Sequence, residues 1–167
     1  MRAPLSVVTL STGETVDLAQ FYAERPVVLV FLRHFGCIFC REQISSLRRF
    51  KDENVVLVSM GRIGEAEEFR RRIESPQVMI SDPSKQLYDA FGLRRGSVSQ
   101  LANARIVKRS LRLMGQGLRQ GLPGRDPFMM AGVFRIDTDG EVSYSHFSSD
   151  ASDNLSGEEI VALLHAK

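Results

Sequence analysis

The stretch that decides the fold is residues 27–42, which read VVLVFLRHFGCIFCRE. Its first six residues are apolar and rich in valine, as in a strand that is buried on both faces of a sheet. After the turn residue Gly36, apolar residues recur at the spacing of a helix: Cys40, Ile44, Leu47 and Phe50. The stretch therefore predicts a buried strand, a short loop and an amphipathic helix.

Strands and helices continue to alternate downstream of this stretch. Two further apolar runs, residues 55–59 and 78–81, predict strands, and a helix between them begins near Gly64 with an acidic first turn. A short helix is predicted between Asp82 and Gly92. This order is typical of a βαβ arrangement around a parallel sheet core, so the predicted fold class is α/β.

The second half of the chain predicts an insertion, a hairpin and a last helix. Residues 97–116 have a moderate helical pattern, and the glycines and Pro123 that follow indicate a loop that extends to about residue 125. Strands at 132–137 and 141–146 predict a hairpin, and residues 156–165 predict the closing helix. Because no linker or repeat divides the sequence, we expect a single domain over residues 1–167.

The composition excludes some classes of protein. The longest apolar run is six residues, whereas a helix that spans a bilayer needs about 20. The N-terminus has one basic residue and no apolar segment behind it, so we predict no secretion signal and expect a cytoplasmic protein. The 22 basic and 20 acidic residues give a net charge of +2, which favours no particular partner.

Basic residues are nevertheless concentrated in one segment. Residues 91–125 contain eight of them and no acidic residue: Arg94, Arg95, Arg105, Lys108, Arg109, Arg112, Arg119 and Arg125. A solvated helix surface and an anion-attracting rim near a binding site are both consistent with this pattern. Single-stranded nucleic acid is not an expected partner, because the segment lacks the interleaved aromatic residues on which bases stack.

The only two cysteines, Cys37 and Cys40, form a Cys-x-x-Cys pair at the start of the predicted helix. Cys37 is expected to be exposed there, where free backbone N–H groups and the helix dipole stabilise a thiolate. Cys40 shares the apolar stripe of the helix, so we expect its sulfur to be buried and less ionised. The pattern predicts that Cys37 is the nucleophile and that Cys40 resolves the intermediate.

Three neighbouring side chains are candidates for a supporting role. Arg33 and Arg41 flank the pair, and a cation beside a thiolate lowers the pKa of the thiol; each is also consistent with a solvated surface group. His34, at the end of the predicted strand, either stabilises the Cys37 thiolate or only caps the strand. These alternatives stay open from the residues alone.

A metal site is the alternative interpretation of the same motif. His34, Cys37 and Cys40 supply three potential ligands for zinc or another thiophilic metal within seven residues. A closed zinc site needs a further ligand, and the remaining histidines, His146 and His165, are distant in the sequence. We therefore rank redox chemistry first, with no metal and no cofactor expected.

The segment 27–42 resembles the active-site region of the peroxiredoxin-like branch of the AhpC/TSA (alkyl hydroperoxide reductase/thiol-specific antioxidant) superfamily. The resemblance continues through residues 81–93, 117–121, 132–134 and His146. It implies a thioredoxin-like fold, in which helices flank a central mixed β-sheet, with a helical insertion near 97–125. It also implies a thiol-dependent oxidoreductase that acts on an O–O or S–S bond, since members are linked to peroxide defence and to reduction of prostaglandin endoperoxides.

The sequence departs from the peroxiredoxin pattern at two places. His34 stands where that family has a hydroxyl residue three positions before the reactive cysteine, and Met129-Met130-Ala131 stands where it has an arginine. The resemblance therefore leaves the substrate open between a small peroxide and a disulfide. The expected electron donor is a dithiol reductant such as thioredoxin or glutaredoxin.

Overall fold

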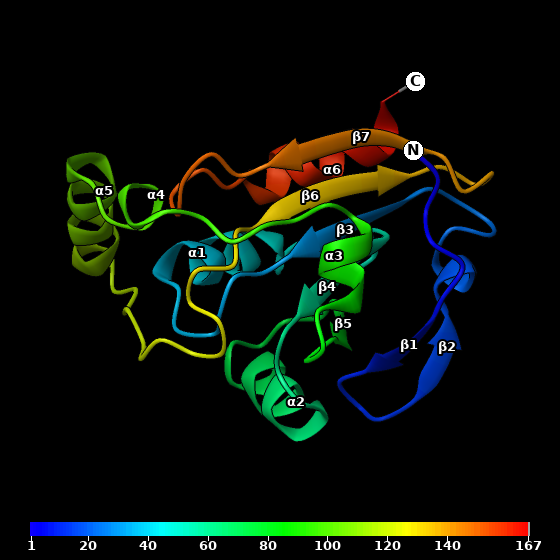
Figure 1. Ribbon diagram of the computed structural model, residues 1–167, viewed down its shortest axis with the longest axis horizontal. Coiled ribbons are helices and arrows are strands. Elements are labelled where there is room, and N and C mark those ends of the chain that lie inside the picture. The colour runs from blue at the N-terminus through cyan, green and yellow to red at the C-terminus, as the bar shows by residue number, and fades with distance from the viewer. Residues whose placement is uncertain (167) are drawn as a thin grey trace.

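The computed structural model describes residues 1–166, which form an α/β fold around one seven-stranded mixed sheet (Figure 1). The strands occur in the order β2-β1-β5-β4-β3-β6-β7. Their bounds are β1 Val7–Leu10, β2 Thr15–Asp17, β3 Val27–Phe31, β4 Val55–Ser59, β5 Val78–Ser81, β6 Gly132–Ile136 and β7 Val142–Phe147. This architecture confirms the predicted thioredoxin-like fold class.

The central strand is β3, and all five of its residues are buried. It pairs in parallel with β4 and antiparallel with β6, so the sheet is mixed, as the resemblance implied. Its alternate residues enter two separate cores. Val28 and Val30 pack on the side of α1 (Ile38–Leu47), whereas Leu29 and Phe31 pack on the opposite side. A helix-covered sheet of this kind explains the continuous apolar run in the sequence.

The helices cover both faces of this sheet (Figure 1). Besides α1 they are α2 Ile63–Arg72, α3 Gln86–Ala90, α4 Val98–Leu101, α5 Ala104–Gly115 and α6 Gly157–His165. α6 packs beside α1 in the first core, whereas α3 belongs to the second. No helix within residues 1–166 has the length and apolar character needed to cross a membrane.

The N-terminal hairpin was not predicted from the sequence. β1 and β2 and the 3₁₀ helix η1 (Leu18–Phe21) precede the deciding stretch, and β1 adds antiparallel to β5 at the edge of the sheet. Only one of the four residues of β1, Val8, is buried, so the apolar alternation that marks a strand in a sequence is weak here.

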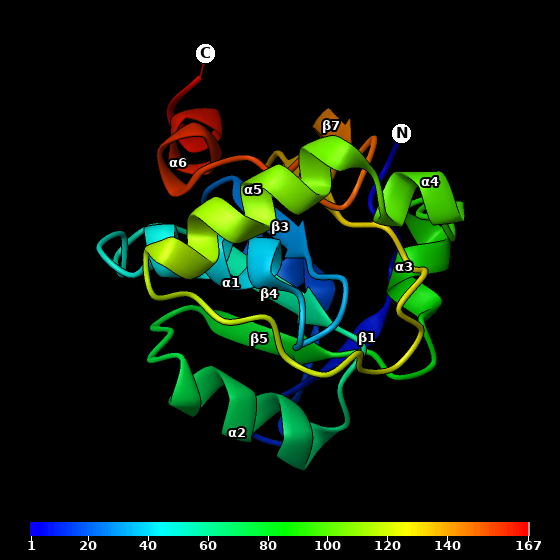
Figure 2. The same ribbon diagram turned by 90° about the vertical axis from the view of Figure 1, so that its left-hand side faces the viewer.

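The predicted helical insertion consists of two helices, α4 and α5, at the end of the molecule where α1 begins (Figures 1 and 2). α5 packs on α1 through its buried residues Ile106 and Leu113. Arg109 joins the two helices by an ion pair to Glu42 at 2.9 Å. Lys108 and Arg112 on α5 are exposed to solvent, as a solvated helix surface would have them.

Candidate functional site

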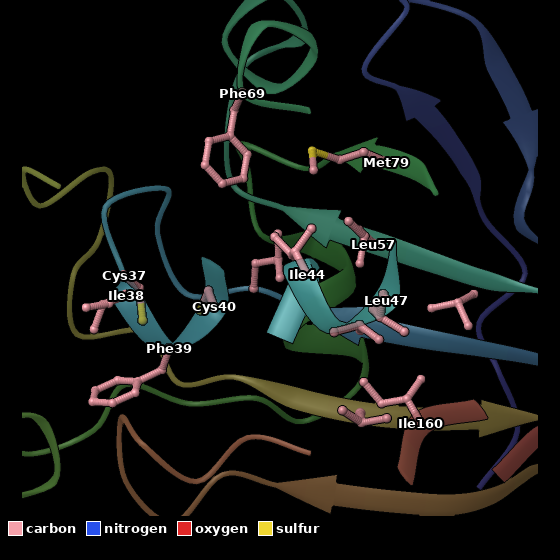
Figure 3. Packing of buried hydrophobic residues seen from close by; sticks show 14 of the residues in the cluster. Cys37, Ile38, Phe39, Cys40, Ile44, Leu47, Leu57, Phe69, Met79 and Ile160 are labelled. Atoms are coloured by element: carbon pink, nitrogen blue, oxygen red, sulfur yellow. The ribbon is translucent and has the colours of Figure 1, made fainter. Parts of the chain in front are cut away.

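The cysteine pair lies where β3 gives way to α1, at the carboxyl end of the central strand (Figure 3). Cys37 is the N-cap residue of α1 and Cys40 lies in its first turn. The N–H of Cys37 donates to the carbonyl oxygen of His34 at 3.0 Å, which closes the loop, and the carbonyl of Cys37 accepts from the N–H of Arg41 at 3.1 Å. The end of the buried strand therefore fixes both sulfur atoms in position.

Both thiols are free and both are buried. Cys40 is 1% exposed, as predicted from its place on the apolar stripe. The expectation that Cys37 is exposed is wrong, because only 2% of it is accessible. The cause is tertiary: the chain that follows α5 returns across the loop, and the N–H of Gly121 donates to the carbonyl of Gly36 at 2.8 Å.

The two thiols differ in their ionisation. The Cys40 thiol, the Arg33 guanidinium and the amides of Phe39 and Cys40 stabilise the Cys37 thiolate, and together they outweigh burial and lower the pKa of Cys37 to about 6. The pKa of Cys40 is raised well above its usual value, because it donates to Cys37 and because it is buried. At pH 7 the pair therefore holds a thiolate at Cys37 and a thiol at Cys40.

Arg33 is a buried cation beside this thiolate, not a solvated surface group. Its side chain donates from Nη1 to Sγ of Cys37 at 3.6 Å, from Nε to the carbonyl of Met129 at 3.2 Å and from Nη2 to the carbonyl of Pro127 at 2.7 Å. No carboxylate among residues 1–166 lies within ion-pair distance of it. A buried charge is costly without a partner, so the Cys37 thiolate is its natural counter-ion.

This guanidinium lies beside the backbone that leads into β6. The peroxiredoxin pattern has an arginine in the sequence just before that strand, where this chain has Met129-Met130-Ala131. Arg33 comes instead from the end of β3 and reaches the carbonyl of Met129. This chain therefore has a guanidinium next to the Cys37 sulfur, supplied from a different place in the sequence.

His34 is buried and neutral at pH 7. Burial, followed by the charges of Arg33 and Arg41, lowers the pKa of His34 to about 4. The thiolate therefore receives its positive neighbour from Arg33 and not from an imidazolium. The Nδ1 atom of His34 is buried without a hydrogen-bond partner among the described residues.

Arg41 donates hydrogen bonds to backbone carbonyls of two segments, the loop before α1 and the segment after α5. Its Nε donates to the carbonyl of Phe35 at 2.9 Å and its Nη1 donates to the carbonyl of Arg119 at 3.2 Å. The side chain thereby connects the first turn of α1 to the segment that follows α5.

A cavity of about 610 Å³ opens beside the loop. Its lining is mixed, with the apolar side chains of Met60, Phe69 and Leu122 among charged groups. The site residues Arg33, His34 and Arg41 all contribute to its wall, whereas Cys37 does not. Residues of α2, Phe69 among them, form another part of the wall, and the Phe69 ring stacks on the ring of Phe35 in the loop, with the centroids 4.2 Å apart. No local pattern in the sequence predicts this contact.

The residues proposed for a metal site do not gather into one. Within residues 1–166 there is no group of three or more histidine, cysteine or acidic side chains with the geometry to hold a metal ion. His146 lies near Asp153 and His165 near Glu53, away from the cysteine pair. The alternative set of His34, Cys37 and Cys40 therefore lacks the arrangement that metal binding requires.

The fold and the position of the pair define a thioredoxin-like protein of the peroxiredoxin type. The chain belongs to the AhpC/TSA antioxidant enzyme family, whose model matches residues 41–150. The match begins directly after Cys40, so membership rests on the chain downstream of the pair.

Similar proteins include the prostamide/prostaglandin F synthase of Danio rerio, which is 29% identical over 164 residues that cover 92% of this chain and 81% of the relative. The human protein peroxiredoxin-like 2C is 29% identical over 91 residues, which cover 50% of this chain and 40% of that protein. Among solved structures, peroxidoxin BcpB from Mycobacterium tuberculosis superposes with a TM-score of 0.69 at 18% identity, covering 99% of this chain and 94% of that one. The last likeness concerns the fold alone.

Proposed function

We propose that the protein reduces a peroxide or a disulfide, with Cys37 as the nucleophile and Cys40 as the resolving thiol. The observation that carries the proposal is the buried Arg33 guanidinium, which donates to Sγ of Cys37 and has no carboxylate partner among residues 1–166. Such a cation favours a thiolate, which is the reactive form of cysteine. Cys40, buried one turn away, remains a protonated thiol until it attacks the Cys37 sulfur.

With a peroxide, the Cys37 thiolate attacks one oxygen, so that an S–O bond forms and the O–O bond breaks. From a hydroperoxide the second oxygen takes a proton from solvent and leaves as water or an alcohol, and Cys37 becomes a sulfenic acid. Cys40 then gives up its proton and attacks the Cys37 sulfur, which forms the disulfide and releases water. From a cyclic endoperoxide both oxygens stay on the substrate: one takes a proton from solvent, and the other forms a sulfenate ester with Cys37, from which attack by Cys40 releases it as the second hydroxyl. A disulfide substrate follows the same order through a mixed disulfide, with a thiol as each leaving group.

The supporting residues act on this reaction in different ways. Arg33 stabilises the thiolate before attack and the negative charge that develops on the leaving oxygen. His34 is neutral and forms part of the cavity wall, so its role is to shape the space next to the loop. Arg41 is a positioning residue, because its hydrogen bonds go to backbone carbonyls.

Two electrons must return to the pair after each turnover. We propose a dithiol reductant such as thioredoxin or glutaredoxin as the donor, since a Cys37–Cys40 disulfide is reduced by thiol–disulfide exchange. The cytoplasm, a reducing compartment, is the location we propose. The named activity of the Danio rerio relative, prostaglandin F synthesis, supports testing an endoperoxide beside simple hydroperoxides.

The test is a thiol count. Reduced protein is mixed with one equivalent of hydrogen peroxide, cumene hydroperoxide, a prostaglandin endoperoxide or glutathione disulfide, and free thiols are counted over time. The wild type should lose two thiols to at least one oxidant, and Cys40→Ser should hold a sulfenic acid or a mixed disulfide on Cys37. Cys37→Ser should not react, and thioredoxin or glutaredoxin should restore both thiols of the oxidised wild type. Retention of both thiols with every oxidant would refute the proposal.

A further inference from the structure

A glycine-rich segment covers the reactive loop. Residues 117–125, here called the roof, run between α5 and the strand β6. None of the nine roof residues is buried, although Cys37 beneath them is only 2% exposed. A segment with so little buried surface depends mainly on its polar contacts, to which Leu118 adds packing on the first core and Arg125 adds an ion pair with Glu65 at 3.5 Å.

Three hydrogen bonds attach the roof to the start of α1. Gly121 donates its N–H to the carbonyl of Gly36 at 2.8 Å, and Arg41 donates from Nη1 to the carbonyl of Arg119 at 3.2 Å. The third bond uses the only roof side chain of the set: Oε1 of Gln120 accepts from the N–H of Ile38 at 3.0 Å.

The hydrogen bond that Gln120 accepts from Ile38 completes the N-terminal cap of α1. The first N–H groups of a helix have no partner within the helix. The N–H of Cys37 donates to the carbonyl of His34 at 3.0 Å, and the next N–H along the chain, on Ile38, donates to Oε1 of Gln120 at 3.0 Å. An amide side chain from the roof therefore sits in the positive end of the helix, next to the reactive residue.

The roof and the loop also fit closely. A Cβ atom on Gly36 would overlap the carbonyl oxygen of Leu122. On Gly121 it would lie 2.8 Å from Nη2 of Arg41 and 3.0 Å from Cα of Gly36. Glycine at these positions is thus what allows the two backbones to touch.

The cavity ends at this contact. Its wall includes Gly36 from the loop and Gly121 and Leu122 from the roof, but it does not include Cys37. In Figure 3 the chain that leads into β6 passes beside Cys37 and Ile38. A molecule bound in the cavity therefore meets the roof before it meets the sulfur.

We propose that Gln120 latches the roof over Cys37 and so selects substrates by size. Small oxidants reach the sulfur through small openings of the roof, whereas bulky peroxides or disulfides must break the bond between Gln120 and Ile38. Gln120 is a positioning residue in this scheme, because it acts on access to Cys37 and not on the reacting bond. The inference rests on the proposed role of Cys37 as the nucleophile.

The experiment compares alkylation of Cys37 by a small reagent, iodoacetamide, and a bulky one, fluorescein maleimide, at pH 7. Gln120→Ala should speed labelling by the maleimide about fivefold, the equivalent of about 1 kcal/mol for one net hydrogen bond, with less than a twofold change for iodoacetamide. Gln120→Glu keeps an acceptor for Ile38 and should keep the maleimide rate relative to iodoacetamide near that of the wild type. Gly36→Ala should displace the roof while Gln120 itself is unchanged. It should raise the ratio of the maleimide rate to the iodoacetamide rate at least as much as Gln120→Ala does.

Gly115→Ala is the matched control, because a Cβ atom there meets nothing within 4 Å. It should leave both rates unchanged, and circular dichroism checks that every variant is folded. The latch is refuted if Gln120→Ala changes neither rate, or if both reagents speed up equally, which would indicate a change in thiol ionisation. Should the size selection appear while no oxidant removes thiols, the latch stands and the proposed oxidoreductase function fails.

Discussion

At the scale of single residues, the site pairs one buried cation with one ionised thiol. Each of the three guanidinium nitrogens of Arg33 donates one hydrogen bond, two of them to backbone carbonyls and one to Sγ of Cys37, so the chain that enters β6 fixes the orientation of the side chain. The guanidinium geometry matters here, because a lysine ammonium cannot hold three separated acceptors in one plane. Charge and position of the cation are thus both supplied by one side chain.

Replacing this cation should raise the pKa of Cys37. In the wild type the rate of iodoacetamide labelling is expected to rise with pH around a midpoint of about 6, because only the thiolate reacts. In Arg33→Met the midpoint should move upward, and the rate at pH 7 should fall about threefold to tenfold, as expected on loss of an adjacent opposite charge. Arg25→Met, which removes an exposed arginine far from the site, is the control and should leave the midpoint near 6.

An unchanged midpoint in Arg33→Met would contradict the role given to Arg33. Arg33→Lys tests charge and geometry separately, because the ammonium keeps the charge but loses the bonds to the carbonyls of Pro127 and Met129. Its labelling midpoint should lie between that of the wild type and that of Arg33→Met.

At the scale of elements, the site depends on how the ends of β3 and β4 are held. Tyr88 on α3 is fully buried, and its hydroxyl lies 2.7 Å from the carbonyl oxygen of Leu32 and 3.0 Å from that of Val58. Leu32 is the residue directly before Arg33. A helix on one face of the sheet therefore fixes the strand end from which the loop on the other side departs.

Tyr88→Phe should destabilise the protein by about 1–3 kcal/mol, because it removes the hydroxyl and leaves part of the hydrogen-bonding capacity of two buried carbonyls unused. Urea unfolding followed by circular dichroism measures this loss. Tyr144→Phe, on the partly exposed strand β7, is the control and should change the free energy of unfolding by less than about 0.5 kcal/mol. Equal stability of Tyr88→Phe and the wild type would mean that the two bonds do not brace the strand ends.

At the scale of the whole molecule, one ionic cluster ties the N-terminal hairpin to the rest of the fold. Glu67 on α2 accepts from the hydroxyl of Ser11 at 2.6 Å and from Arg70 at 2.7 and 2.9 Å. Ser11 follows β1 directly, so the bond joins the N-terminal hairpin to α2, the helix that packs on β5. The hairpin is thereby attached by a charged group as well as by the pairing of β1 with β5.

The same cluster should make stability depend on acid pH. The hydrogen bonds from Arg70 and Ser11 lower the pKa of Glu67 from 4.5 to about 2. A lowered carboxyl pKa adds stability that is fully present above the unfolded value near 4.5 and is lost as the pH falls toward 2. Urea midpoints should therefore fall less steeply between pH 5 and pH 2 in Glu67→Gln than in the wild type. Parallel pH profiles of the two proteins would contradict this assignment; Glu68→Gln, with its exposed carboxyl, is the control.

The fold was largely predictable because its central strands and their helices carry strong local patterns. Residues 27–31, 55–58 and 78–80 are continuous apolar runs, and α1 and α6 have the expected apolar spacing. The hairpin of β1 and β2 was missed because its strands are short and mostly exposed. For the candidate site, spacing predicted that the cysteine pair and its neighbours lie between the central strand and the next helix, whereas Gln120 carries no local signal that links it to α1.

The sequence by itself determined the α/β class, the place of the cysteine pair after the central strand and the identity of the side chains around it. These features depend on periodicity and on neighbours along the chain. Only the tertiary structure decided that Cys37 is buried, that Arg33 and not His34 is its cation, and that a roof lies across the loop. These depend on contacts between residues some 80 to 100 positions apart, which close off access to Cys37 and hold the Arg33 guanidinium beside its sulfur, where the charge favours the thiolate.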